Sequence, residues 1–331
     1  MNIPKVKFYA MSLEENIDLV KWSFYENNGV LSIHDYTIQN FPELASVDIN
    51  DSKKNTYKKI EQVVTEDYKK YKDKIDSEVE KYNNIWNKYN NKYFEMLSNF
   101  FKIDFPEDIK EIEAKVGLIP IFPRYLDTFS FSVSIDLDES KIVEVVAHET
   151  LHFLWFEKWK ELYPETPRRH YDSPYIEWKY SEMVTDPILN NEPFNKLFSF
   201  TERGYDSFYE LYDNDELVMD KLRKIYATND DIEIKIKKGY DYISNRVELI
   251  LNIGRIHTTE LGEKRIKNNL LLDNINVMDY IKNKILDKDC DIYKRGKNYY
   301  CGIDDIRVTI NSYNYCIITA HKIKKGDVYE I

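Results

Sequence analysis

The chain of 331 residues is poor in cysteine and contains no long apolar segment. Its three cysteines, Cys290, Cys301 and Cys316, show no C-x-x-C spacing. Their odd number and late position argue against a disulfide framework or a cysteine-based metal site, and indicate reduced thiols, mostly in the core. No run of about 18 apolar residues is present, so we expect no membrane partner. The N-terminus lacks the basic and then apolar pattern of a signal peptide, which favours a cytoplasmic protein.

The composition supports two folded domains. Hydrophobic residues form 43% and aromatic residues 15% of the chain, which is enough core material to exclude long disordered stretches. A domain usually has roughly 100–200 residues, so this length favours two. Residues 245–331 contain 15 Lys and Arg against 12 Asp and Glu, which gives this part a charge of +3. The whole chain has a net charge of −11, so residues 1–244 carry −14. We expect the two parts to meet different partners.

The first part is predicted to be mainly helical. Residues 12–28 and 51–102 carry apolar side chains near helical spacing among many charged ones. A further helix is expected over residues 174–190, interrupted near Pro187. Residues 201–243 are expected to be mostly helical.

A strand is predicted between Phe129 and Ile135, where apolar residues alternate with serines. If this strand lies at the edge of a sheet, it could pair with an extended peptide substrate. An ordinary core strand would explain the alternation equally well. Asp138 then suits the N-cap of a helix over residues 140–162.

That helix contains the sequence His148-Glu149-Thr150-Leu151-His152. Two histidines four residues apart project from one helix face, about 6 Å apart along the axis, which suits two ligands of one zinc ion. Glu149 can accept a proton from a zinc-activated water. The surrounding segment, residues 141–159, is apolar and holds no Gly or Pro, so unsatisfied ring nitrogens there would be costly. The alternative is that both histidines form hydrogen bonds in a core.

A catalytic zinc site normally takes three protein ligands and leaves a fourth position to water. Glu182, 30 residues after His152, is predicted as the third ligand. Asp186, four residues further on the same helical face, is predicted to accept the distal N–H of a histidine ligand. Glu177 is a rival third ligand, but it has no carboxylate four residues on.

The HETLH motif followed by S-E-x-x-T-D resembles the two motifs of the gluzincins, the thermolysin-like zinc peptidases, as an uncharacterised bacterial branch. The resemblance implies that His148, His152 and Glu182 bind zinc, that Glu149 is the general base in hydrolysis of a peptide or protein, and that Asp186 supports a ligand. No histidine stands at the metzincin distance after His152, and the G-x-M-E-N segment of the large aminopeptidases is absent, which excludes both subfamilies.

The group that would stabilise the oxyanion stays open at this point. A tyrosine or histidine is the usual choice. Four candidates are His170, Tyr171, Tyr205 and Tyr209.

The sequence beyond residue 245 predicts a compact α+β unit. Helices are expected over residues 246–269 and 276–287, and short strands around residues 290–293, 297–302, 306–311 and 314–320. The predicted fold class is therefore α+β, with a mainly helical zincin-like domain containing a small mixed sheet (1–243) and a small α+β domain (244–331). The segments HTTELG, RGKN and ITAHK resemble a small bacterial domain family of unknown function.

A second site is predicted in this C-terminal part. A helix-borne histidine, a basic turn and the end of the last strand would converge on a phosphate through His257, Lys294, Arg295, Lys297, Thr319 and His321. The pattern is similar to the barnase–EndoU–colicin–RelE ribonucleases, which implies metal-independent RNA cleavage with His257 and His321 as acid and base. The alternative is a nucleic-acid- or protein-binding module, with the zinc domain regulatory or structural.

Overall fold

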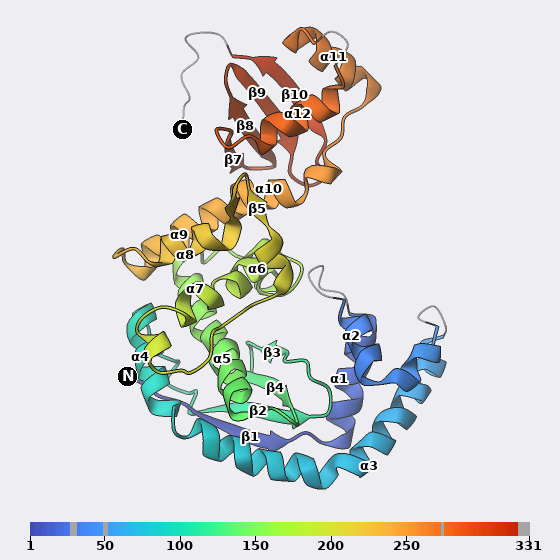
Figure 1. Cartoon of the computed structure of the whole chain (residues 1–331), viewed down its shortest axis with the longest axis vertical. Helices are drawn as coiled ribbons and strands as arrows, with labels where there is room; N and C mark the ends of the chain where they lie inside the picture. The colour runs from blue at the N-terminus through green and yellow to red at the C-terminus, as the bar shows by residue number, and fades with distance from the viewer. Residues whose placement is uncertain (27–31, 49–51, 273–274, 324–331) are drawn as a thin grey trace. The chain divides into compact units, whose positions relative to one another are not determined.

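The computed structural model describes residues 1–26, 32–48, 52–272 and 275–323. The chain divides into two compact units, Met1–Asp206 and Ser207–Ile331. Helices predominate and the strands form small sheets, which confirms the predicted α+β class (Figure 1). Within the described ranges, no helix combines the length and apolar character that crossing a bilayer requires. The domain boundary predicted between residues 243 and 244 lies inside the second unit, and it stays a prediction.

The first unit is built on a small mixed sheet in the order β1-β2-β4-β3. Its strands are β1 (Lys5–Ala10), β2 (Glu111–Gly117), β4 (Ser130–Ser134) and β3 (Arg124–Tyr125). The first three run parallel, and β3 pairs antiparallel with β4. The Ser132 N–H also donates to the carbonyl of Pro123 at 3.0 Å. The predicted strand β4 is therefore an inner strand, and the adjacent edge is β3.

The early helical prediction is confirmed by α1 (Leu13–Tyr25), α3 (Lys53–Trp86) and α4 (Asn90–Phe101), with α2 (Ile33–Asn40) and the 3-10 helix η1 (Pro42–Ser46) between the first two. Figure 1 shows α3 as a long curved helix that follows the sheet. Buried residues such as Ile60 and Val64 recur on one face of α3, whereas its charged residues are exposed or only partly buried.

Helix α5 (Glu139–Leu162) forms as predicted, and its N-cap is Asp138, whose Oδ1 accepts the Lys141 N–H at 2.8 Å. The helix is buried on most sides because it packs against α3, α4, α7 and β4. The Tyr93 hydroxyl donates to the Ala147 carbonyl at 2.6 Å. This bond joins α4 to α5 at the residue before His148.

After α5 the chain forms a series of short helices. They are the 3-10 helix η2 (Arg168–Tyr171), α6 (Ile176–Met183), α7 (Thr185–Leu189) and the 3-10 helix η3 (Phe194–Lys196). The predicted interruption near Pro187 occurs between α6 and α7, at Val184. Pro187 cannot donate to the carbonyl of Met183 and its ring would collide with that group, so a continuous helix is excluded.

The expectation of mostly helical structure over residues 201–243 is wrong for its first part. The 3-10 helix η4 (Asp206–Glu210) and the two-stranded hairpin β5 (Tyr212–Asp213) and β6 (Glu216–Leu217) precede α8 (Val218–Tyr226) and α9 (Ile232–Tyr242). The hairpin turns at Asn214, which has φ +61°. Asparagine tolerates this left-handed conformation, so a turn replaces the expected helix.

The predicted helix over residues 246–269 is also interrupted. A π-helical turn η5 (Ile243–Val247), α10 (Glu248–Leu251) and the 3-10 helix η6 (Ile253–Arg255) come first, and α11 (Glu260–Leu270) starts after an extended stretch. Thr259 caps α11 by accepting the Gly262 N–H. His257 precedes this helix instead of lying on it, and it forms a parallel bridge with Cys316.

The second unit ends in α12 (Val277–Leu286) and an antiparallel sheet in the order β10-β9-β8-β7. Its strands are β7 (Asp291–Arg295), β8 (Asn298–Ile303), β9 (Ile306–Asn311) and β10 (Ile317–Lys322). They confirm the predicted small α+β unit. The last strand begins later than expected because the chain turns at Tyr315, with φ +59°.

Candidate metal centre

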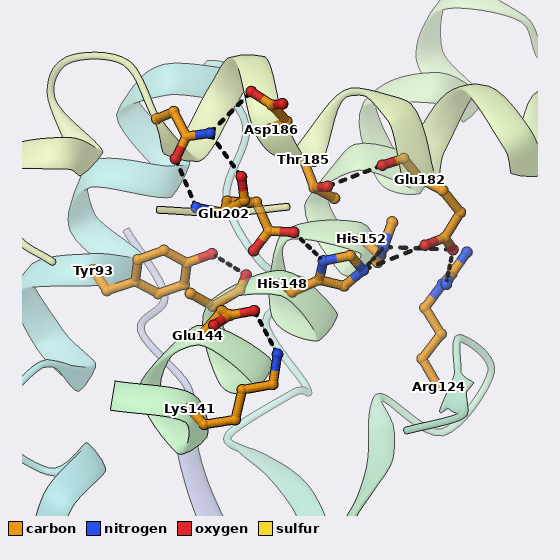
Figure 2. A network of polar contacts seen from close by, with 12 residues as sticks. Tyr93, Arg124, Lys141, Glu144, His148, His152, Glu182, Thr185, Asp186 and Glu202 are labelled. Carbon is orange, nitrogen blue, oxygen red and sulfur yellow. Dashed lines mark hydrogen bonds and ion pairs between the residues drawn. The ribbon is translucent and has the colours of Figure 1, made fainter. Parts of the chain in front are cut away.

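Three predicted ligands meet in the first unit (Figure 2). His148 and His152 extend from α5, and Glu182 reaches them from α6. The His148 Nε2 atom lies 3.1 Å from His152 Nε2 and 3.3 Å from Glu182 Oε2, and His152 Nε2 lies 3.7 Å from Glu182 Oε1. The side chains are 17%, 0% and 4% exposed, respectively. The three donor groups therefore share one nearly enclosed position.

This geometry fits zinc. With bonds of about 2.0–2.1 Å, neighbouring donors of a tetrahedral zinc ion lie about 3.3–3.4 Å apart. The observed separations of 3.1, 3.3 and 3.7 Å bracket that value. Two imidazoles and one carboxylate also form the donor set of known catalytic zinc sites, which keep a fourth position for water.

Glu202, which the sequence analysis missed, is the partner of the first histidine. Its Oε1 atom lies 2.8 Å from His148 Nδ1, and its side chain is 1% exposed. Glu202 lies between η3 and η4, in a segment without regular secondary structure. No periodicity or motif marks this residue, so the sequence offered no signal for it.

Arg124 on β3 was also missed. Its Nη1 donates to Glu182 Oε1 at 2.6 Å and its Nη2 to Ser181 Oγ at 3.3 Å. The guanidinium lies over the Phe156 ring, 5.6 Å from its centroid. Arg124 therefore holds one oxygen of Glu182, while the other oxygen faces His148.

The buried charges shift the pKa values of the site in opposite directions. Burial opposes the charged form of His148, but Glu202 and Glu182 outweigh it and raise the pKa of His148 well above its usual value. Burial, together with the charge of Arg124, lowers the pKa of His152 well below its usual value. Burial favours the neutral form of Glu182, yet Arg124 and the histidines hold the pKa of Glu182 below its usual range. Negative charge at this position is thus balanced by cations.

Glu149 lies next to the first ligand and is 6% exposed. Burial raises its pKa to about 7, against the opposing attraction of His148 and Arg124. A carboxylate with a pKa near neutrality can both accept and release a proton at physiological pH. The role of Glu149 as a general base stays a prediction.

Several buried polar atoms around the site have no hydrogen-bond partner within the described parts of the chain. They are Glu149 Oε2, His152 Nδ1, Arg124 Nε and Glu202 Oε2. Buried polar groups are nearly always paired in folded proteins, so a cluster of exceptions indicates a functional site.

The remaining candidates near the motif have other contacts. Asp186 Oδ1 accepts from the Asn190 side chain at 2.9 Å, and the place beside His148 Nδ1 that was predicted for Asp186 is taken by Glu202. The rival ligand Glu177 lies beside another histidine, with its Oε2 atom 3.2 Å from His170 Nδ1. It is not part of the three-residue group around His148.

The aromatic candidates for oxyanion stabilisation are packed in different surroundings. The His170 ring stacks on Tyr175, and the buried Tyr171 ring packs against Phe156. Tyr205 packs near Trp178. Tyr209 belongs to the second unit. The Arg124 guanidinium, in contrast, reaches Glu182 directly.

The residues predicted for a C-terminal phosphate site are spread over the small sheet. His257 pairs with Cys316 beside the start of β10, whereas His321 pairs with Arg307 near the end of that strand. The five residues from Cys316 to His321 span about 16 Å at about 3.3 Å per residue. Thr319 pairs with Thr309 in between. The predicted convergence of these three residues is therefore wrong.

The basic residues lie on the opposite edge strand, β7, and its turn into β8. Lys294 forms an ion pair with Glu248 at 3.2 Å, and Arg295 and Lys297 are at the turn and both are exposed. Strands β8 and β9 separate them from β10. They do not complete a site with His321.

Comparison with known proteins gives one result. No curated protein and no solved structure matches this chain. The resemblance of the C-terminal part to a domain family of unknown function is confirmed, since residues 250–321 match the family described as Protein of unknown function (DUF3781).

Proposed function

We propose that the first unit is a zinc-dependent hydrolase that cleaves peptide bonds. The observation that carries the proposal is the convergence of His148, His152 and Glu182 beside a buried carboxylate, Glu149, whose pKa is about 7. Zinc, when bound to the three ligands, supplies Lewis-acid activation of water and of a substrate carbonyl. The choice of a peptide bond rests on the resemblance of the two sequence motifs to those of gluzincins.

The protein groups divide the remaining work. Glu149 accepts the proton of the attacking water and delivers it to the leaving amine, because a pKa near 7 allows both transfers. Arg124 places a buried positive charge beside the ligand set, where it would stabilise negative charge that develops on a substrate oxygen. An extended peptide that pairs with the sheet would lie along the edge strand β3, at Arg124 and Tyr125.

Metal content is the first test. Protein purified without chelator should hold about one zinc per chain, and His148→Ala or His152→Ala should lose it, as measured by elemental analysis. Glu149→Gln should retain zinc, since it changes no ligand, and should lose hydrolysis of a fluorescence-quenched peptide library. Absence of stoichiometric metal in the wild-type protein would overturn the proposal.

A ribonuclease activity of the second unit is not proposed. The sheet register separates His257 from His321, so the acid and base that this chemistry needs are apart.

A further inference from the structure

We propose that Glu202 is the positioning residue of the metal centre. It holds the His148 ring with Nδ1 protonated and thereby presents the Nε2 lone pair to the metal. The inference rests on the proposed zinc function, but the hydrogen bond that it invokes can be tested in the metal-free protein as well.

The first step is the direction of one hydrogen bond. Glu202 Oε1 and His148 Nδ1 are 2.8 Å apart and both side chains are largely shielded from water. A carboxylate oxygen is the natural acceptor in such a pair, so we assign the proton to Nδ1. In a neutral ring the other nitrogen, Nε2, is then a bare acceptor, which is the form that binds zinc.

The second step is how Glu202 is itself held. Asn190, the residue after α7, accepts the Glu202 backbone N–H at its Oδ1 (2.7 Å) and donates Nδ2 to the Glu202 carbonyl (2.8 Å). The same amide nitrogen donates to Asp186 Oδ1 at 2.9 Å. A primary amide has two N–H donors, so all three bonds coexist. Asp186 thus supports His148 indirectly, through Asn190 and Glu202 (Figure 2).

The third step is the asymmetry between the two histidines. His148 Nδ1 has the carboxylate of Glu202, whereas His152 Nδ1 is buried with no hydrogen-bond partner among the described residues. Only the first ligand is therefore oriented by a charged acceptor. Such partners of a metal-bound histidine typically change metal affinity by about 10–100-fold when removed.

The test measures zinc affinity by competition with a chromogenic chelator, and ligand geometry by the absorption spectrum of the Co²⁺-substituted protein. Glu202→Gln keeps an acceptor but loses the charge, and we expect about tenfold weaker zinc binding. Glu202→Leu removes the acceptor, and we expect about a hundredfold weaker binding and an altered Co²⁺ spectrum. The Glu202→Gln side chain has nearly the shape of the original one, so this variant tests the role of Glu202 even if Glu202→Leu impairs folding.

Glu144→Gln is the matched control. Glu144 lies on α5 one turn before His148 and acts on that histidine electrostatically, while its carboxylate accepts from Lys141. Its loss should leave zinc affinity unchanged. An equal weakening by Glu144→Gln and Glu202→Gln would overturn the proposal, because charge alone would then explain both. Zinc binding by Glu202→Leu as tight as in the wild type would also overturn it.

A measurement on the metal-free protein separates this inference from the proposed function. Nitrogen NMR of ¹⁵N-histidine-labelled protein reports which ring nitrogen bears the proton. We expect His148 Nδ1 to bear a proton in the wild type, whether or not Nε2 bears one as well, and to lose it in Glu202→Leu. Failure of the wild type to bind zinc would overturn the proposed function, whereas an unchanged protonation pattern in Glu202→Leu would overturn the role of Glu202.

Discussion

The two histidine pairs suggested by the sequence have opposite outcomes in the structure. His148 and His152 share one helix, and their Nε2 atoms are 3.1 Å apart. His257 and His321 belong to different elements, and the register of the small sheet keeps them apart. Helical spacing fixes neighbours within one element, whereas contact across a sheet depends on strand order, which residue types alone do not specify. The predictions below test this contrast, from the largest effect to the smallest.

The largest effect is expected for Arg124→Ala, which tests how far the α5 site depends on another element. The change leaves the Glu182 carboxylate, only 3% exposed, without the guanidinium that donates to its Oε1 atom. Removing one partner of a buried ion pair typically costs about 3–5 kcal/mol. Urea denaturation of the metal-free protein should show a loss of this size, and zinc should recover part of it because the ion supplies positive charge.

Arg168→Ala is the control for this prediction. Arg168 also forms ion pairs, with Asp127 and Asp172, but its side chain is 40% exposed. An exposed pair contributes less than about 1 kcal/mol, because water screens it. Equal losses in the two variants would show that burial of the Arg124 pair is not decisive.

An intermediate effect is expected from the acid–base group of the site. Burial raises the pKa of Glu149 from its usual 4.5 to about 7, so the folded protein keeps this proton to higher pH than the unfolded chain does. The contribution of Glu149 to stability should therefore decline between pH 4.5 and about 7, by about 3 kcal/mol in total. The Glu149→Gln variant has no ionisable group at this position. With a chelator present, its free energy of unfolding should therefore fall over this pH range by about 3 kcal/mol less than that of the wild type.

Guanidinium denaturation at several pH values measures this difference. Glu139→Gln changes an exposed carboxylate on the same helix and should follow the wild-type pH dependence. The same pH dependence in the wild type and in Glu149→Gln would refute the shifted pKa of Glu149.

The smallest effect is expected in the second unit. His257 is exposed and His321 half-buried, so replacing either by Ala should change the free energy of unfolding by less than about 0.5 kcal/mol. Because they are far apart, the double variant should be additive within about 0.5 kcal/mol. A coupling above about 1 kcal/mol in this double-mutant cycle would contradict their separation.

The parts of the fold that could be predicted are those set by local periodicity. Helix α5, its N-cap Asp138 and the shared face of His148 and His152 all follow from spacing within one element. Glu202 and Arg124 could not be predicted in the same way. Glu202 lies 54 residues from His148 in the sequence, and Arg124 lies 58 residues from Glu182. Only the tertiary fold brings each pair together.

The wrong helical predictions have a related cause. Residues around Asn214 and His257 carry helix-compatible patterns, but the chain there makes a left-handed turn and an extended bridge. Both are stabilised by pairing with neighbouring strands. Tertiary contacts outweigh weak local propensity in such short segments.

Burial of α5 also sets the timescale on which the site can open. Fifteen of its 24 residues are buried, so its central amides should exchange with solvent only when the whole unit unfolds. Arg124 comes from a two-residue strand and Glu202 from an irregular segment, where local opening is far less costly. The two histidines thus belong to the slowest-exchanging part of the unit, and the groups that hold His148 and Glu182 in place belong to parts that can open and close many times before α5 does.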